Sequence, residues 1–243
     1  MIYFALDLET PSLSPKGGIL QLALVLEDTT VDTPVDQLQH FVGYVVRDSY
    51  DHVEPYAASM HAGLWRKIDR MRRGDDAEAP IPHNRTEAMS ESSDFLCNMA
   101  ANWVRNVLAD RGEPEGRVTV AGKNVATFDY QFITDELKAC FRHRVLDPGS
   151  GFADFSRKTL PSLDELLERF GLGRTVQHDA LEDARDVIRV LRCAPGYSSR
   201  PSPVDAMHDA IDAARTPDGQ RCIKCGTVNC QADVLDQVRR GAA

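Results

Sequence analysis

The opening segment, residues 2–9, constrains the fold most, because it alternates in a way that only a β-strand can satisfy. In a strand, Ile2, Phe4, Leu6 and Leu8 point to one face, and Tyr3, Ala5, Asp7 and Glu9 point to the other. Burying two like charges side by side is costly unless a cation neutralises them. Hard carboxylate oxygens suit Mg²⁺ or Mn²⁺. The alternative is a strand end whose two acids face solvent.

The remaining patterns predict an α/β fold with a mixed β-sheet flanked by helices, as in the ribonuclease H-like architecture. Further strands are expected at residues 19–27, 41–46 and 117–121, the first two forming a meander with residues 2–9. Helical spacing predicts helices over residues 92–108, 128–141, 163–170 and 179–191.

Length and composition suit one α/β domain with a small appendage, since 42% of the 243 residues are hydrophobic. We expect a domain over residues 1–193, a Pro/Gly/Ser-rich linker over 194–203, and a C-terminal segment over 204–243. A net charge of −9 argues against a broad basic surface for long duplex DNA, but not against a small site for a strand end. The sequence shows no export or membrane segment, so residence in the cytoplasm is the expectation.

Two other segments carry acids where neighbouring strands and helices meet. Asp129 follows a short apolar strand and the turn at residues 122–124, at the entry of an expected helix. Asp183 lies in the second turn of the expected helix 179–191, and His178 precedes that helix on backbone that lets its ring reach a bound water. Taken singly, Asp129 fits a helix N-terminus stabilised by the helix dipole, and the other two fit a solvated surface.

Taken together, these segments resemble the DEDD-type 3′→5′ exonucleases with a histidine in the third motif. This family includes polymerase proofreading subunits, ribonuclease T and oligoribonuclease. The resemblance rests on Asp7-Leu8-Glu9-Thr10, on residues 124–132 around Asp129, and on the spacing from His178 to Asp183. It spans residues 1–192 and implies a ribonuclease H-like fold with a small Cys-containing C-terminal appendage.

The resemblance implies a two-metal mechanism that removes nucleoside monophosphates from the 3′ ends of single-stranded DNA or RNA. Two Mg²⁺ or Mn²⁺ ions would be held by Asp7 as the bridge, with Glu9, Asp183 and Asp129. His178 would take the proton of the attacking water. The residues implied to contact substrate are Thr10, His61, Asn124 and Phe128.

Two other functions remain open. A ribonuclease H-type endonuclease would use a similar carboxylate cluster, but His178 five residues before Asp183 favours the exonuclease. A catalytically silent nucleic-acid-binding module would be expected to lack at least one of the five residues, and all are present. A basic cluster over residues 66–73 could steer a single strand, with Trp65 as a stacking platform, but the pattern favours a solvated helix face.

The C-terminal segment carries Cys222, Cys225 and Cys230, whose first pair has the two-residue gap of a zinc knuckle. His208 or Cys193 would have to supply the fourth ligand of a structural Zn²⁺. The alternative is a flexible tail with reduced thiols. A zinc-bound module would be suited to contact a protein partner or the substrate strand.

Overall fold

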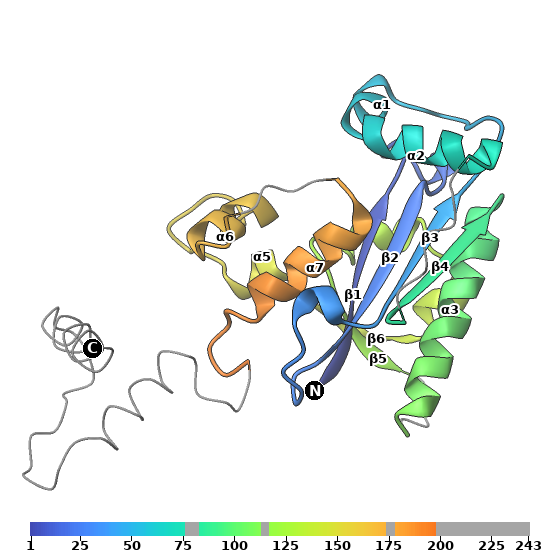
Figure 1. Cartoon of the computed structure of the whole chain (residues 1–243). Coiled ribbons are helices and arrows are strands. Elements are labelled where there is room, and N and C mark those ends of the chain that lie inside the picture. Colours follow the sequence, from blue (N-terminus) through green and yellow to red (C-terminus); the bar gives the residue numbers. More distant parts are fainter. Residues whose placement is uncertain (76–82, 113–116, 174–177, 198–243) are drawn as a thin grey trace, which may run out of the picture. The chain divides into compact units, whose positions relative to one another are not determined.

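The computed structural model describes residues 1–75, 83–112, 117–173 and 178–197, and a six-stranded sheet forms the centre of this part of the chain (Figure 1). These residues belong to the compact unit Met1–Tyr197. Helices cover both faces of the sheet, which confirms the expected α/β, ribonuclease H-like architecture. Cys222, Cys225 and Cys230, with the rest of the predicted appendage, lie outside the described residues.

The sheet has the strand order β4-β3-β2-β1-β5-β6. Its strands are β1 (Ile2–Glu9), β2 (Gln21–Asp28), β3 (His40–Val45), β4 (Arg85–Ser90), β5 (Val118–Ala121) and β6 (Phe141–Leu146). Only β2 runs antiparallel to its neighbours, so the last residue of β1 and the first residue of β2 lie at the same end of the strands. At that end Glu9 pairs with Gln21, and Gln21 pairs with Tyr44.

Two helical layers sandwich the sheet. The helices are α1 (Pro55–Met60), α2 (Ala62–Arg73), α3 (Ser93–Asp110), α4 (Asp135–Lys138), α5 (Pro148–Gly151), α6 (Leu163–Arg169) and α7 (Ala180–Leu191), with short 3-10 helices η1 (Pro15–Gly17), η2 (Val35–Gln37) and η3 (Asp129–Gln131). Helix α3 packs on one face, and α6 and α7 pack on the other. None of the described helices is both long and apolar enough to cross a bilayer.

The alternation predicted for β1 is confirmed. Phe4 and Leu6 pack into the core under α3, whereas Tyr3 and Ala5 pack against α6 and α7. Asp7 and Glu9 therefore lie on the face that α7 covers. Ala180 and Ala184 are fully buried, and these small side chains let α7 approach the strands that carry the two acids.

The prediction of one helix over residues 128–141 was wrong. The segment forms η3, a break, the short helix α4 and the start of β6 at Phe141. Phe132, Ile133 and Leu137 all enter the core under α3, so tertiary packing overrides the helical spacing. Strands β4 and β6 were not predicted, because they are edge strands whose side chains are mostly exposed or half-buried and carry no apolar run.

Candidate metal centre

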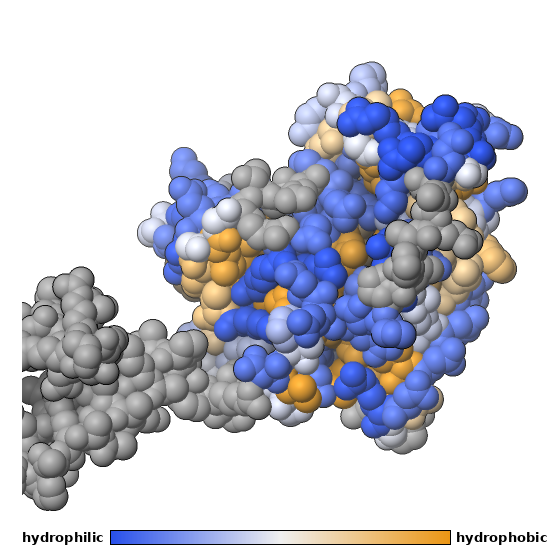
Figure 2. Space-filling view, viewed as in Figure 1, coloured by the Kyte–Doolittle hydropathy of each residue, from blue (hydrophilic) through white to orange (hydrophobic). Residues whose placement is uncertain are grey.

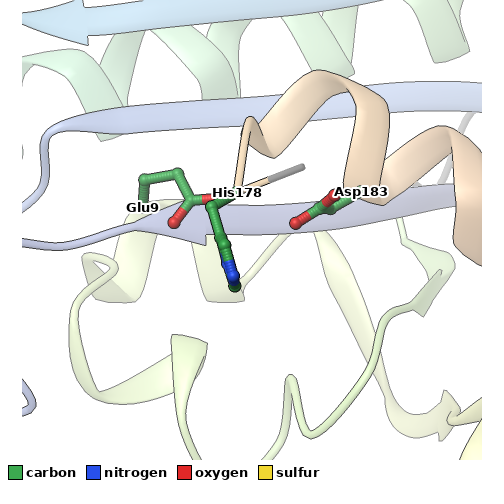
Figure 3. Close-up of side chains that lie close together, drawn as sticks. All are labelled: Glu9, His178 and Asp183. Carbon is green, nitrogen blue, oxygen red and sulfur yellow. The ribbon is translucent and has the colours of Figure 1, made fainter. Parts of the chain in front are cut away.

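Helix α7 brings Asp183 to the end of β1. One ligand atom from each of Glu9, His178 and Asp183 lies within 4.8 Å of the others. Figure 3 shows the three side chains side by side, with Asp183 reaching from α7 towards the other two. The two carboxylates are each only 5% exposed, whereas His178 is exposed. The cluster thus has two buried carboxylates and an imidazole that is open to solvent.

Asp7 and Asp129 extend the same cluster. Asp129 is 3% exposed at the start of η3. Burial raises the pKa of Asp129 to about 8, while hydrogen bonds from its own backbone and from the backbone of Leu8 oppose that rise. Burial is also the largest cause of the raised pKa of Asp7, followed by the charge of Glu9 and then that of Asp129. The four predicted carboxylates are therefore close enough to perturb one another.

Glu9 shows the electrostatic cost of this arrangement. Burial, and then the charges of Asp183, Asp179 and Asp129, raise the pKa of Glu9 to about 9. In the described part of the chain, no Lys or Arg forms an ion pair with Asp7, Glu9 or Asp129. Carboxylates crowded in this way are stable in their charged form only if a cation is supplied. Their oxygen donors suit Mg²⁺ or Mn²⁺, so the residues present fit divalent ions.

His61 does not supply that positive charge. Its Nδ1 lies 3.2 Å from Glu9 Oε2, without the geometry of a hydrogen bond. Burial, and then the charge of His178, lower the pKa of His61, and a hydrogen bond to the backbone of His178 opposes this. The ring is 2% exposed and stands edge-on to His178, with 6.0 Å between the ring centroids. His61 is thus an uncharged side chain that lines the site, and its predicted contact with substrate stays a prediction.

His178 occupies an unusual backbone conformation. Its φ is +53°, in the left-handed region that residues other than glycine seldom adopt. Such strain persists only where the surroundings hold it, and it is common at functional sites. The next residue, Asp179, caps α7 by accepting hydrogen bonds from the backbone of Leu181 and Glu182. His178 thus directly precedes the N-cap residue of α7.

The other residues predicted to touch substrate lie close to the acidic residues in the sequence. The buried Thr10 donates its hydroxyl proton to the carbonyl of Ser12, at 2.8 Å. Asn124 is exposed, has a φ of +60°, and donates its backbone N–H to Asp147 Oδ2 at 2.9 Å. Phe128 is half-buried against Phe132, with ring centroids 5.0 Å apart. Their contacts with substrate stay predictions.

The structure also corrects the prediction for Trp65 on α2. Trp65 is half-buried and packs edge-on against Tyr50, with centroids 4.8 Å apart, so it is not an open stacking platform. Figure 2 shows that much of the surface over α2 is hydrophilic, as a solvated helix face would be. Asp186, three residues after Asp183 on α7, is fully buried and pairs with Arg189.

The sequence analysis did not identify Gln21 as a residue near this site. Gln21 is fully buried beside Glu9 and hydrogen-bonds to the start of α7. The one signal in the sequence was a polar residue directly before the apolar run at residues 22–26.

Comparison with known proteins finds no matching protein-family model and no matching curated sequence. Solved structures do show likeness. Escherichia coli exonuclease I in complex with a dT13 oligonucleotide is 15% identical with a TM-score of 0.48, over 79% of this chain and 40% of that one. Exonuclease I from Methylocaldum szegediense is 16% identical with a TM-score of 0.45, over 86% of this chain and 43% of that one.

The pseudoubiquitin hydrolase-RNA exonuclease module of Saccharomyces cerevisiae Pan2, with AAGGA RNA, is 16% identical with a TM-score of 0.43, over 78% of this chain and 28% of that one. The chain therefore spans less than half the length of each of these three structures. At such low identities and TM-scores, function has to be argued from the site itself.

Proposed function

We propose that the protein is a metal-dependent 3′→5′ exonuclease that removes nucleoside monophosphates from the 3′ ends of single-stranded nucleic acid. One observation carries the proposal: buried carboxylates from β1, η3 and α7 converge beside an exposed histidine. Among the described residues no Lys or Arg pairs with Asp7, Glu9 or Asp129, and like charges buried in this way favour the binding of cations from solution. A histidine at the open side of such a cluster is placed to exchange a proton.

Asp7, Glu9, Asp129 and Asp183 would hold two divalent cations. When bound, the cations would neutralise charge on the phosphate and lower the pKa of the attacking water. The carboxylates have two tasks of their own: they fix the ions against β1 and α7, and their crowding disfavours the ion-free state.

His178 would accept the proton of the attacking water. It is exposed, whereas the carboxylates beneath it are buried, so its ring can meet a substrate that comes from solvent. The ring of His61 stands edge-on to that of His178, with 6.0 Å between the ring centroids, so His61 packs beside the proposed base. A general base has to be held within hydrogen-bonding reach of the proton it removes.

The preference for exonuclease over endonuclease rests on the spacing of His178 and Asp183 in the third motif of the sequence. A decisive test uses one oligonucleotide, labelled in separate samples at the 3′ end and at the 5′ end, with Mn²⁺ as the added ion. Early release of the 3′ label as a mononucleotide, with a stepwise ladder from the 5′ label, would support the proposal. Internal fragments from both labels would support the endonuclease, and no product would support a binding module.

The same assay on matched DNA and RNA strands would identify the preferred sugar. Recognition of a 2′-hydroxyl requires a contact in the site, so a preference should change KM or kcat for one strand only. A variant with Asp7 replaced by Asn serves as the inactive control, and it excludes a contaminating nuclease.

A further inference from the structure

Gln21, the first residue of β2, ties the start of α7 to the sheet. Its Nε2 lies 3.2 Å from Asp179 Oδ2, and its Oε1 accepts the backbone N–H of Ala180 at 3.0 Å. The side chain is fully buried. It therefore makes two hydrogen bonds to two consecutive residues that lie 158 and 159 positions away in the chain.

The chemistry of these partners fixes the orientation of the amide. The carboxylate of Asp179 can only accept, and the N–H of Ala180 can only donate. A carboxamide is the side chain that offers both a donor and an acceptor at this length. The N–H of Ala180 is among the first in α7, where no helical carbonyl is available to it. Gln21 thus completes the N-terminal cap that Asp179 begins.

Gln21 also stands in a row of side chains that leads directly to the acidic cluster. Across the sheet it pairs with Glu9 on one side and with Tyr44 on the other. Tyr44 Oη lies 3.5 Å from Gln21 Nε2 and accepts a hydrogen bond from Lys67 of α2 at 2.6 Å. The bonds to Asp179 and Ala180 therefore connect the Glu9 end of the sheet to the residues that directly follow His178.

We propose that Gln21 is a positioning residue that holds the start of α7 so that His178 can reach the reacting water. This inference rests on the proposed function. His178 has a strained backbone and is followed by the two residues that Gln21 holds. Releasing residues 179 and 180 would let the strained φ relax and move the ring. A misplacement of about 1 Å in a catalytic group can lower a rate about 10²-fold.

Asp183 depends much less on Gln21. Its backbone N–H bonds to the carbonyl of Asp179 within α7, at 2.9 Å. The body of α7 is fixed to β1 and β2 by Ala184, Val187 and Ile188, all of which are buried. Losing Gln21 should therefore disturb His178 while leaving the carboxylates able to bind Mn²⁺.

The test is Gln21→Met, which keeps the length and approximate volume of the side chain but removes both hydrogen bonds. We expect kcat on a 3′-labelled strand to fall about 10- to 100-fold with little change in KM. In a His178→Ala background, the same substitution should cause no further loss of kcat. Coupled residues give such non-additive effects, whereas a purely structural loss would lower activity equally in both backgrounds.

A second readout does not depend on activity. Amide hydrogen exchange at Ala180 should be faster in Gln21→Met, while exchange at Leu6 and Leu24 in the middle of the sheet should match the wild type. Tyr3→Phe is the control, because it removes another buried polar group, one that bonds to Tyr197 at 3.0 Å. It should leave both kcat and exchange at Ala180 unchanged.

If Gln21→Met does not fold, Gln21→Asn keeps an uncharged amide on a side chain one methylene shorter, which weakens the contacts with Asp179 and Ala180, so a smaller loss of kcat is expected. Wild-type kcat in the folded variant, or equal losses with and without His178, would overturn the inference. A wild-type protein that cuts no strand would overturn the proposed function instead, and unchanged exchange at Ala180 would then still refute the tether.

Discussion

Buried acids lie at both ends of the β1–β2 strand pair, and the described part of the chain shows an Arg paired with a strand acid at one end. At one end Glu27, 1% exposed, lies 2.6 Å from the guanidinium of Arg192. At the other end, Asp7 and Glu9 meet Asp129 and Asp183, and no Lys or Arg of the described chain pairs with Asp7, Glu9 or Asp129. The same sheet thus holds Glu27, which is paired with Arg192, and the acidic cluster around Asp7, which is suited to bind metal ions.

The pKa shifts at the two ends express this difference. Burial raises the pKa of Glu27, but the hydrogen bond and the charge of Arg192 both lower it. Burial and neighbouring acids together raise the pKa of Glu9 to about 9. An internally paired acid stabilises a fold only through its partner, whereas a crowded acidic cluster is stabilised by bound cations. Glu27 is therefore structural, and the Asp7 cluster is the candidate site.

The largest effect should come from Asp7→Asn, which keeps the shape of the side chain and removes its charge. We expect cleavage of a 3′-labelled strand in Mg²⁺ to fall to background. The melting temperature without metal should stay the same or rise at pH 8, because like-charge repulsion is relieved. Cleavage near the wild-type rate would show that the assignment of the site is wrong.

His178→Ala should lower kcat about 10²- to 10⁴-fold, the usual range for loss of a general base. Calorimetric binding of Mn²⁺ should survive, since the carboxylates remain. His143→Ala, on the exposed side of β6, is the matched control and should be as active as the wild type. Because His178 lies within ligand distance of Glu9 and Asp183, an equal loss of Mn²⁺ binding would make it a ligand instead.

A substitution at the opposite end of the β1–β2 strand pair, where Glu27 meets Arg192, should lower the stability of the protein and leave its activity unchanged. Glu27→Gln leaves Arg192 without its carboxylate, and we expect unfolding in urea to show a loss of about 3 kcal/mol. That value is the low end for a broken buried pair, because the Arg192 side chain is 24% exposed. Activity measured well below the melting temperature should be unchanged. A large loss of activity in folded Glu27→Gln would remove the distinction between the two ends.

The smallest effect should be the pH dependence of the metal-free protein. Asp129 and Glu9 have pKa values of about 8 and 9, above the values near 4 that carboxyls have in an unfolded chain. Stability from their protonated forms is fully present below about pH 4 and is lost as pH rises towards 9. Between pH 4 and pH 9 the melting temperature should fall as the pH rises, and added Mn²⁺ should raise the melting temperature most at the alkaline end of this range. An equal effect of Mn²⁺ at pH 5 and pH 8.5 would contradict this.

How far the sequence predicts this molecule depends on the range of the interactions. The alternation in β1 and the helical spacing of α3 and α7 are local patterns, and they predicted both the layers and the face on which Asp7 and Glu9 lie. The edge strands β4 and β6 carry no such pattern, and the core contacts of Phe132 and Leu137 broke the expected helix.

Parts of the site also depend on long-range contacts that no local pattern encodes. Gln21 reaches Asp179 across 158 positions, and Glu27 reaches Arg192 across 165. The sequence could show which acids were candidates for ions. It could not show which buried acid already had a cation, because that depends on which residues the fold brings together.

The most direct test of this distinction is calorimetric titration of Mn²⁺ into metal-free wild type, Asp7→Asn and Glu27→Gln. Any ion held elsewhere in the chain would be common to all three proteins. We predict about two Mn²⁺ at the acidic cluster of the wild type and of Glu27→Gln, and a loss of this binding in Asp7→Asn. The same Mn²⁺ binding in Asp7→Asn as in the wild type, or none in any of the proteins, would contradict the account.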